Sequence, residues 1–447
     1  MKKFFTTLSN IWKIEDLRVR IINTLLFLLI YRVGSYIVLP GVNAASLNST
    51  QNKEGLVGLL NMFAGGSFSR SSILALGVMP YISASIVVQL LGIAVPYFIK
   101  LQKEGESGRN KINQWTRYLT IGITALQAIG YLKSQVSADA MLIPNPYFTI
   151  LNTCLLTAGT LFVMWLGEKI TDKGIGNGIS LIIMVGIIAQ LPSAFVVEFQ
   201  SRTGGAGGLI GFIIEIVALL GVVMFTILIV QGTRKIAVQY AKRIVGNKQY
   251  GGVRQYIPLK VNAAGVMPII FAQALMFIPA TVSQFFPSAT SNSVIIALSN
   301  PNSWQHNTTF GILIILFTYF YTAITVNPNQ MADDMKKNGG FIPGIKPGKT
   351  TADFIDGVIS KITLPGSIFL AIIAIVPALA SLVGVSSLFS RFFGGTSLII
   401  LVGVVLDTLQ QVESHLLMRH YDGLMKTGRI KGRASIPTAS GATPPVI

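Results

Sequence analysis

The sequence predicts an all-α membrane protein with ten transmembrane helices, arranged as two inverted five-helix halves. Hydrophobic residues make up 51% of the 447 residues and charged residues only 12%, whereas soluble domains carry about 25% charge. Ten spans of roughly 20 residues need about 200 apolar positions, and this composition supplies them. The same figures exclude a soluble enzyme, a disordered chain and a secreted disulfide scaffold. The lone Cys154 and three scattered histidines predict no disulfide, no metal site and no cofactor.

Apolar runs of spanning length follow one another along the chain. They start near Ile21, Val78, Tyr118, Thr149, Ile179, Leu209, Val261, Phe310, Thr363 and Gly394. The fifth run is short, because Pro192 closes it. The glycine-rich linker 204–208 divides the spans into two sets of five, residues 21–203 and 209–415. Since five is odd, the second half enters the membrane from the opposite side, as in an inverted repeat with a pathway between its halves.

Lys and Arg are distributed unevenly between the two sides of the membrane. Of the 35 basic residues, 29 fall on the side that carries both termini, so the positive-inside bias places both termini in the cytoplasm. Residues 1–20 are expected to form an amphipathic segment on the cytoplasmic surface. Residues 416–447 are expected to form a cytoplasmic tail, which is disordered after Arg433.

The spans contain few of the ionisable side chains that pumps and transporters usually carry inside the membrane. Arg32, Glu215 and Asp407 are the exceptions, and interfacial snorkelling or a local ion pair is the preferred interpretation of all three. The sequence contains no phosphate-binding loop, metalloprotease motif or other catalytic constellation. It therefore does not predict an enzyme.

Isoleucines recur at helical spacing near the middle of two spans. Ile82 and Ile86 lie four residues apart in the second run, and Ile183 and Ile187 do so in the fifth. Each pair therefore occupies one face of its helix. From spacing alone, lipid-facing or core packing is the better interpretation, because such pairs are common in apolar helices.

The segment LNMFAGGSFSRSSILALG, residues 60–77, is too polar and too rich in glycine to span a membrane. It nevertheless leads directly into the second run on the outer side. Irregular backbone at membrane depth is tolerated only where protein or a water-filled cavity surrounds it. A re-entrant element in an outward-facing funnel and a surface loop explain this pattern equally well.

Two cytoplasmic loops are candidate docking sites. Residues 231–260 contain no acidic residue and seven basic ones: Arg234, Lys235, Lys242, Arg243, Lys248, Arg254 and Lys260. Residues 328–362 contain the turn FIPGIKPGKT, whose prolines and glycines hold Lys346 on a protruding loop. Both loops suit an anionic partner such as ribosomal RNA or an acidic protein face. The alternative is that they set the topology and attract lipid headgroups.

Four longer motifs resemble the SecY family of protein-translocation channels. They are LNMFAGGSFSRSSILALGVMPYISASIVVQLL (60–91), EKITDKGIGNGISLII (168–183), PLKVNAAGVMPIIF (258–271) and FIPGIKPGKTTADFID (341–356). The motifs occur in matching order, and the resemblance covers nearly all of residues 10–433.

This resemblance implies a clamshell of two halves around a central, hourglass-shaped pore. The waist of the pore would be a ring formed by Ile82, Ile86, Ile183, Ile187, Ile270 and Ile400. Such a ring makes no hydrogen bonds and resists wetting, so any polypeptide sequence can pass while ions are held back. The plug that closes the outer funnel would be residues 61–73, namely Asn61, Met62, Phe63, Ala64, Gly65, Gly66, Ser67, Phe68, Ser69, Arg70, Ser71, Ser72 and Ile73. A lateral gate between spans two and three on one side and seven and eight on the other would include Val87, Gln89 and Ala274.

The resemblance also implies a function and a set of partners. SecY-like channels translocate unfolded preproteins across the bacterial cytoplasmic (inner) membrane and insert membrane proteins into it. The implied partners are SecE and SecG subunits, the SecA motor, the ribosome, signal sequences, preproteins and membrane lipids. The implied docking residues are Arg234, Lys235, Lys242, Arg243, Lys248, Arg254 and Lys346.

The resemblance is incomplete at one docking residue, and the sequence leaves a second function open. Lys346 stands where the family usually has arginine, so the charge is kept and the planar fork is lost. The alternative function is secondary transport of a small apolar solute, which would need neither the plug nor the basic loop.

Overall fold

The structure is a computed structural model that describes residues 12, 14–43, 61–136, 140–204, 208–240, 243–245, 248–250, 254–285, 297–298, 300 and 302–426. The sequence-based expectations for residues 1–11 and for the tail after residue 426 lie outside the described residues. Within them, ten helices are 16 to 34 residues long. They are α2 (Glu15–Gly34), α5 (Met79–Ala94), α7 (Glu106–Gln135), α8 (Tyr147–Lys173), α9 (Gly178–Thr203), α10 (Gly208–Gln231), α11 (Met267–Phe285), α13 (Trp304–Thr325), α15 (Lys349–Leu382) and α17 (Gly395–Lys426).

These ten helices fit the predicted ten spans. Among the described residues, six helical segments are long and apolar enough to cross a membrane by themselves, and a seventh is reached if the bent pair α5 and α6 (Pro96–Lys103) is one span. The most apolar part of α10 is only 11% buried inside the protein. Its outward face consists of large aliphatic side chains, which is the surface that a lipid-facing helix needs.

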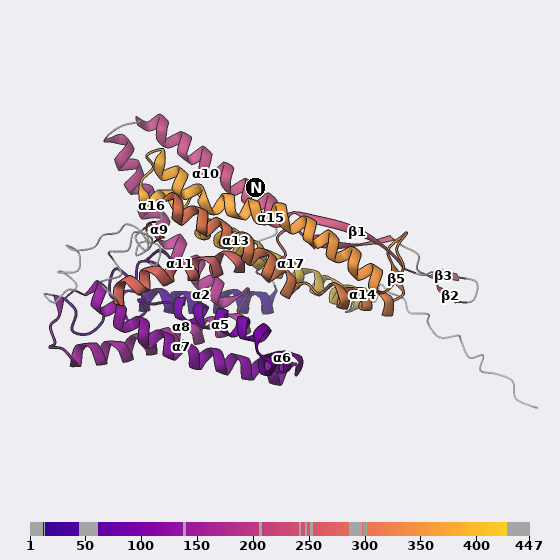
Figure 1. The fold of residues 1–447 in the computed structure, drawn as a ribbon, viewed down its shortest axis with the longest axis horizontal. Helices are drawn as coiled ribbons and strands as arrows, with labels where there is room; N and C mark the ends of the chain where they lie inside the picture. The colour runs from indigo at the N-terminus through magenta and orange to yellow at the C-terminus, as the bar shows by residue number, and fades with distance from the viewer. Residues whose placement is uncertain are drawn as a thin grey trace, which may run out of the picture.

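The helices form two groups that meet along two seams (Figure 1). Helices α2, α5, α7, α8 and α9 pack on one another, as do α10, α11, α13, α15 and α17. At one seam, α9 contacts α10, α16 (Ser387–Ser390) and α17. At the other seam, α11 contacts α5 and α7. The chain therefore folds as two five-helix halves with a shared interior between the seams.

Several helix boundaries differ from the sequence-based expectation, among them the ends of α9 and α17. Helix α9 continues through Pro192 to Thr203, so the fifth span does not end at the proline. A proline inside a helix removes one backbone donor, and membrane helices accept this loss when neighbours satisfy the freed carbonyl. Helix α17 runs to Lys426, past the predicted end of the second half at residue 415.

A small sheet, which the sequence pattern did not predict, projects from one end of the helical body. Strands β1 (Thr233–Tyr240), β4 (Arg254–Lys260) and β5 (Gly340–Phe341) form it in the order β4-β1-β5. Thr233 pairs with Lys260 and Gln239 with Arg254 in the antiparallel register. The hairpin β2 (Arg243–Val245) and β3 (Lys248–Tyr250) lies beyond it. Helix α14 (Pro328–Lys337) leads into β5.

Alternation explains why the residues of β1 form a strand. Ile236 and Val238 are buried against a cluster that includes Leu259 of β4, Met335 of α14 and Ile355 of α15, whereas the residues next to them in the strand are exposed or half-buried. This is the period-two pattern of a sheet with one covered face. Pro258 lies in β4, an edge strand, where a missing backbone donor is tolerated.

Candidate pore, plug and docking surface

The six isoleucines singled out as a ring come together in one apolar cluster. Four of them are buried, and Ile86 and Ile270 are half-buried and pack against the same cluster. They come from α5 and α9 of one half and from α11 and α17 of the other. Ile187 is fully buried. The region between the halves is thus filled by branched aliphatic side chains, which offer no hydrogen bond to anything that passes.

Residues 61–73, the plug segment, are buried or half-buried, and none of them is exposed on the surface. Met62 and Phe63 belong to the same cluster as the isoleucines, and Phe68 packs in a second cluster of the first half. Ser67 and Ser71 have no exposed surface. Of the two interpretations that the sequence left open, a surface loop is therefore wrong. The segment lies within the protein, directly against the ring.

The plug segment satisfies part of its own backbone. The Ser67 hydroxyl donates to the carbonyls of Ala64 and Leu74, at 2.7 and 3.2 Å. The Asn61 side-chain oxygen accepts from the backbone N–H of Ser69 at 3.0 Å. These bonds stabilise an irregular turn in which Gly65 has positive φ, a conformation that favours glycine.

Two glycines allow the plug segment to approach the ring closely. Gly186 lies on α9, between Ile183 and Ile187 in sequence, and is buried. A Cβ atom at this position would stand 2.6 Å from the Phe63 carbonyl oxygen and 3.2 Å from the Gly65 nitrogen. The backbone of the plug segment therefore touches the backbone of α9, and only glycine permits that contact.

The predicted lateral-gate residues lie on helices that face each other across a seam. Helix α11, which carries Ala274, contacts both α5 and α7. Val87 on α5 is 40% exposed and Ala274 is half-buried. The Gln89 amide bonds within its own helix, to the Ser85 hydroxyl at 3.2 Å.

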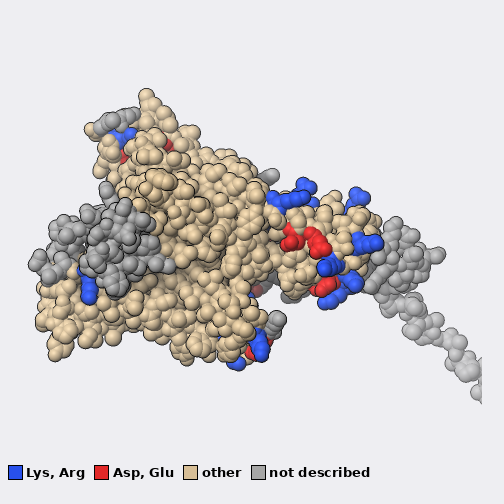
Figure 2. Space-filling view, in the orientation of Figure 1, with Lys and Arg blue, Asp and Glu red and all other residues tan. Residues whose placement is uncertain are grey.

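The predicted docking residues gather on the projecting sheet and the loop beside it. Figure 2 shows most Lys and Arg side chains at this end, with a broad uncharged belt over the helical body. Arg234, Lys235, Arg254 and Lys346 are exposed. Lys242 lies outside the described residues, as do the side chains of Arg243 and Lys248. The Thr351 hydroxyl donates to the Lys346 carbonyl at 2.9 Å, which fixes the turn between β5 and α15.

A buried ion cluster, which the sequence pattern did not reveal as a unit, joins the halves at the opposite end. Arg202 of α9 pairs with Glu198 at 3.1 Å and with Glu215 of α10. It also donates to the Gly384 carbonyl at 2.9 Å, and Glu198 accepts from the backbone of Ser386. Glu215 is therefore part of a local ion pair, one of the two interpretations favoured from the sequence. The cluster stabilises the seam where the chain passes from the first half to the second.

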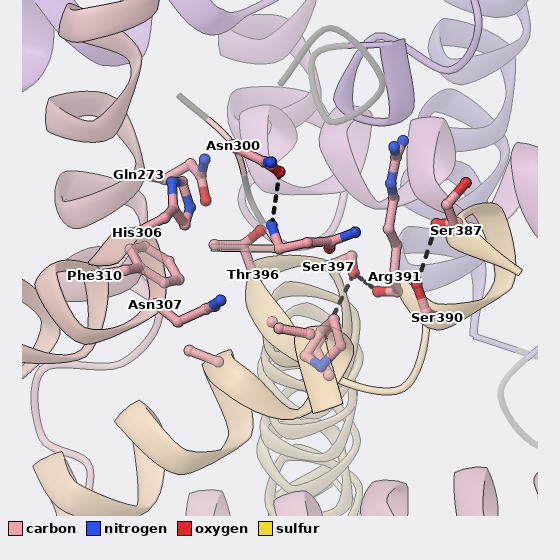
Figure 3. Close-up of a pocket in the computed structure, with 16 residues that line it drawn as sticks. Gln273, Asn300, His306, Asn307, Phe310, Ser387, Ser390, Arg391, Thr396 and Ser397 are labelled. Carbon is pink, nitrogen blue, oxygen red and sulfur yellow. Dashed lines mark hydrogen bonds between the residues drawn. The ribbon is translucent and has the colours of Figure 1, made fainter. Parts of the chain in front are cut away.

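A polar cleft of about 200 Å³ lies within the second half, at the ends of α13 and α17 that point away from the sheet. Figure 3 shows amide and hydroxyl side chains around it. The His306 Nδ1 atom bonds the Leu298 carbonyl at 2.6 Å, whereas the buried Gln273 amide nitrogen has no partner among the described residues. A polar space of this size holds water molecules that satisfy such donors. It contains none of the six isoleucines.

The geometry defines a class of protein: a polytopic helical membrane protein whose two halves enclose an apolar constriction covered by a buried segment. A family model described as SecY matches residues 72–409. The chain belongs to the SecY family.

Similar proteins agree with this membership. The protein translocase subunit SecY of Streptomyces scabiei is 43% identical over 438 residues, which cover 94% of this chain and 100% of that protein. A solved protein-conducting channel superimposes with a TM-score of 0.63 at 17% identity, over 89% of this chain and 92% of that one.

Two further solved structures share the fold. One is a SecY structure concerned with the plug domain that stabilises the closed state and maintains a membrane seal, with a TM-score of 0.60 and 18% identity over 89% of this chain and 92% of that one. The other is Sec61 in the canine ribosome–channel complex from the endoplasmic reticulum, with a TM-score of 0.60 and 16% identity over the same shares.

Proposed function

We propose that this protein is the protein-conducting channel of a translocase and that unfolded polypeptide passes between its two halves, through the ring of six isoleucines. The observation that supports this most strongly is the single apolar cluster that joins the ring to Met62 and Phe63 of the plug segment. An aliphatic constriction accepts every sequence, because it makes no specific polar contact. It resists wetting when it is empty.

Residues 61–73 act in this proposal as the plug of the resting channel. Their burial against the ring supports this role, as does the close backbone contact at Gly186. Val87, Gln89 and Ala274 would lie along the lateral gate, where the seam between α5, α7 and α11 opens towards lipid. Signal sequences and the apolar segments of membrane proteins would leave by that route.

The basic end of the molecule would face the cytoplasm, with both chain termini on that side. The positive-inside bias supports this orientation, and the uncharged belt in Figure 2 supports a helical body that lies within the membrane. The location proposed is the bacterial inner membrane. SecE and SecG are the proposed membrane partners, and SecA and the ribosome are the proposed sources of driving force. The exposed Arg234, Lys235, Arg254 and Lys346 would contact these anionic partners.

A translocation assay tests the proposal. The chain is reconstituted into vesicles with SecE and SecG, and an unfolded preprotein is added with SecA and ATP. We expect the preprotein to become protected from external protease only when SecA and ATP are both present. Deletion of residues 61–70 should raise the resting ion conductance and spare translocation. Motor-independent uptake of a small apolar solute, without preprotein transport, would instead support a secondary transporter.

A further inference from the structure

Three side chains outside the plug segment donate hydrogen bonds to its backbone. The bonds are Gln190 Nε2 to the Asn61 carbonyl at 2.7 Å, Arg32 Nη1 to the Gly65 carbonyl at 2.8 Å, and Tyr131 Oη to the Phe68 carbonyl at 2.7 Å. The three carbonyls lie in the first eight residues of the segment, so the bonds hold it from its start to Phe68. We call Arg32, Tyr131 and Gln190 the anchor residues.

All three anchor residues belong to the first half of the protein. Arg32 lies on α2, Tyr131 on α7 and Gln190 on α9. The second half contributes apolar neighbours to the cluster around Met62 and Phe63, among them Phe389 and Ile400. These three directional bonds tie the plug segment to the first half, whereas the described neighbours of this cluster from the second half are apolar and make van der Waals contacts, which weaken steeply with small separations.

We infer that the anchor residues are positioning residues for gating, which hold the plug segment on the first half and set how often the resting channel opens. This inference rests on the proposed role of residues 61–73 as the plug. When the halves begin to separate, the segment stays with the first half, and the pore clears only after the anchor bonds break. Because the acceptors are backbone carbonyls, substitutions of plug side chains leave these bonds in place.

A purely structural explanation makes a different prediction. Buried carbonyls need donors in any folded protein, and the same bonds would then contribute only to the stability of the fold. A structural role affects the protein whether or not the plug is present. A gating role disappears when the plug is removed, since the anchor residues then have no carbonyl to hold. The presence of the plug is therefore the variable that separates the two explanations.

The Tyr131→Phe substitution gives the cleanest test. It removes the hydroxyl, which also bonds the Ser71 hydroxyl of the plug segment at 3.2 Å, and it keeps the ring, which packs edge-to-face on Phe68 with centroids 4.7 Å apart. The Gln190→Leu substitution tests a second anchor on a half-buried side chain, so a folding defect at one site does not prevent the test. Tyr147→Phe is the matched control, because that side chain is 72% exposed and lies on α8.

The measurement is the ion conductance of the channel, reconstituted with SecE and SecG in planar bilayers, without motor or preprotein. Losing one neutral hydrogen bond should raise the resting open probability by about two- to tenfold. The double variant should exceed either single variant, and Tyr147→Phe should match the parent. In a chain lacking residues 61–70, neither anchor substitution should change the conductance further.

Two results would overturn the inference while leaving the proposed function intact. One is parental conductance in both anchor variants, although deletion of residues 61–70 raises it. The other is an equal rise in chains with and without the plug segment. If the deletion itself leaves the resting conductance unchanged, the plug role fails, and the inference fails with it.

Discussion

The contact between Gly186 and the plug segment offers the sharpest single perturbation of the closed state. In Gly186→Ala, the new Cβ atom would lie 2.6 Å from the Phe63 carbonyl oxygen. Ordinary contacts of this kind begin above 3 Å, so the plug segment has to move by about half an ångström. That movement also disturbs the anchor bonds, because Asn61 and Gly65 lie on either side of Phe63.

The size of the effect follows from the cost of overpacking. Inserting a methyl group into a packed interior costs about 1–3 kcal/mol. The open channel, in which the plug segment has left α9, does not bear that cost. The ratio of open to closed channels should therefore rise by about five- to a hundredfold. The usual gain from replacing a helix-interior glycine by alanine applies to both states and cancels in this ratio.

Single-channel recording measures this ratio directly. Gly221→Ala in α10 is the matched control, because a Cβ atom there would meet nothing within 4 Å. We expect a higher resting open probability for Gly186→Ala, parental behaviour for Gly221→Ala, and no effect of either substitution once residues 61–70 are deleted. If Gly186→Ala rests as tightly closed as the control, the plug segment does not press on α9 in the resting channel.

Three other perturbations probe the ring, the gate and the docking surface. Ile187→Asn should ease wetting and opening, so that preproteins with weakened signal sequences enter vesicles more readily; equal or lower transport by folded protein would argue against the ring. Cysteines replacing Val87 and Ala274 should form a disulfide that blocks membrane insertion when it is oxidised. Crosslinking of an apolar substrate segment to lipid measures this insertion. If the oxidised channel still releases the segment into lipid, the gate lies elsewhere. Lys346→Glu should weaken SecA or ribosome binding, since losing one partner of a charged pair that is desolvated at the interface costs about 2–5 kcal/mol, whereas Lys346→Arg should bind at least as tightly. Unchanged affinities in titrations at two salt concentrations would show that the loop only sets topology.

The helical architecture was predictable because span length and hydrophobicity are strong local signals. The sheet was not predicted, although the buried Ile236 and Val238 alternate with less buried residues in β1. The basic residues of loop 231–260 predict a docking surface from their charge alone, and that prediction makes no use of the alternation in β1. Pro192 predicts a helix end, but α9 continues through it, since packing in a membrane protein outweighs one missing donor.

In the candidate site, too, some residues are indicated by the local sequence, whereas others are brought together only by the fold. Spacing of Ile82 and Ile86 did not distinguish a ring from ordinary packing, and resemblance to the SecY family had to supply the role. Arg32 was visible as a charge within an apolar run, yet its partner is a backbone carbonyl 33 residues further on. Tyr131 and Gln190 carry no sequence signal at all, because any polar residue at a suitable point of its helix could reach a carbonyl of the plug segment. Such contacts are determined only by the fold.

The free energy that holds the plug segment in place and the free energy that a signal sequence gains in the bilayer have to be of similar size if the channel is to discriminate between substrates. The two neutral anchor bonds contribute about 0.5–1.5 kcal/mol each and the charged Arg32 bond about 1.5–3 kcal/mol, so together they hold the plug segment by roughly 2.5–6 kcal/mol. A signal h-region of about 7–15 apolar residues gains about 0.3–0.6 kcal/mol per residue in the bilayer centre, which amounts to roughly 2–9 kcal/mol. A long, strongly apolar signal therefore exceeds the anchor energy, whereas a short or polar one does not. Loss of one anchor bond lowers the threshold by about the contribution of two or three apolar residues, so Tyr131→Phe should admit signals that are shorter by that number.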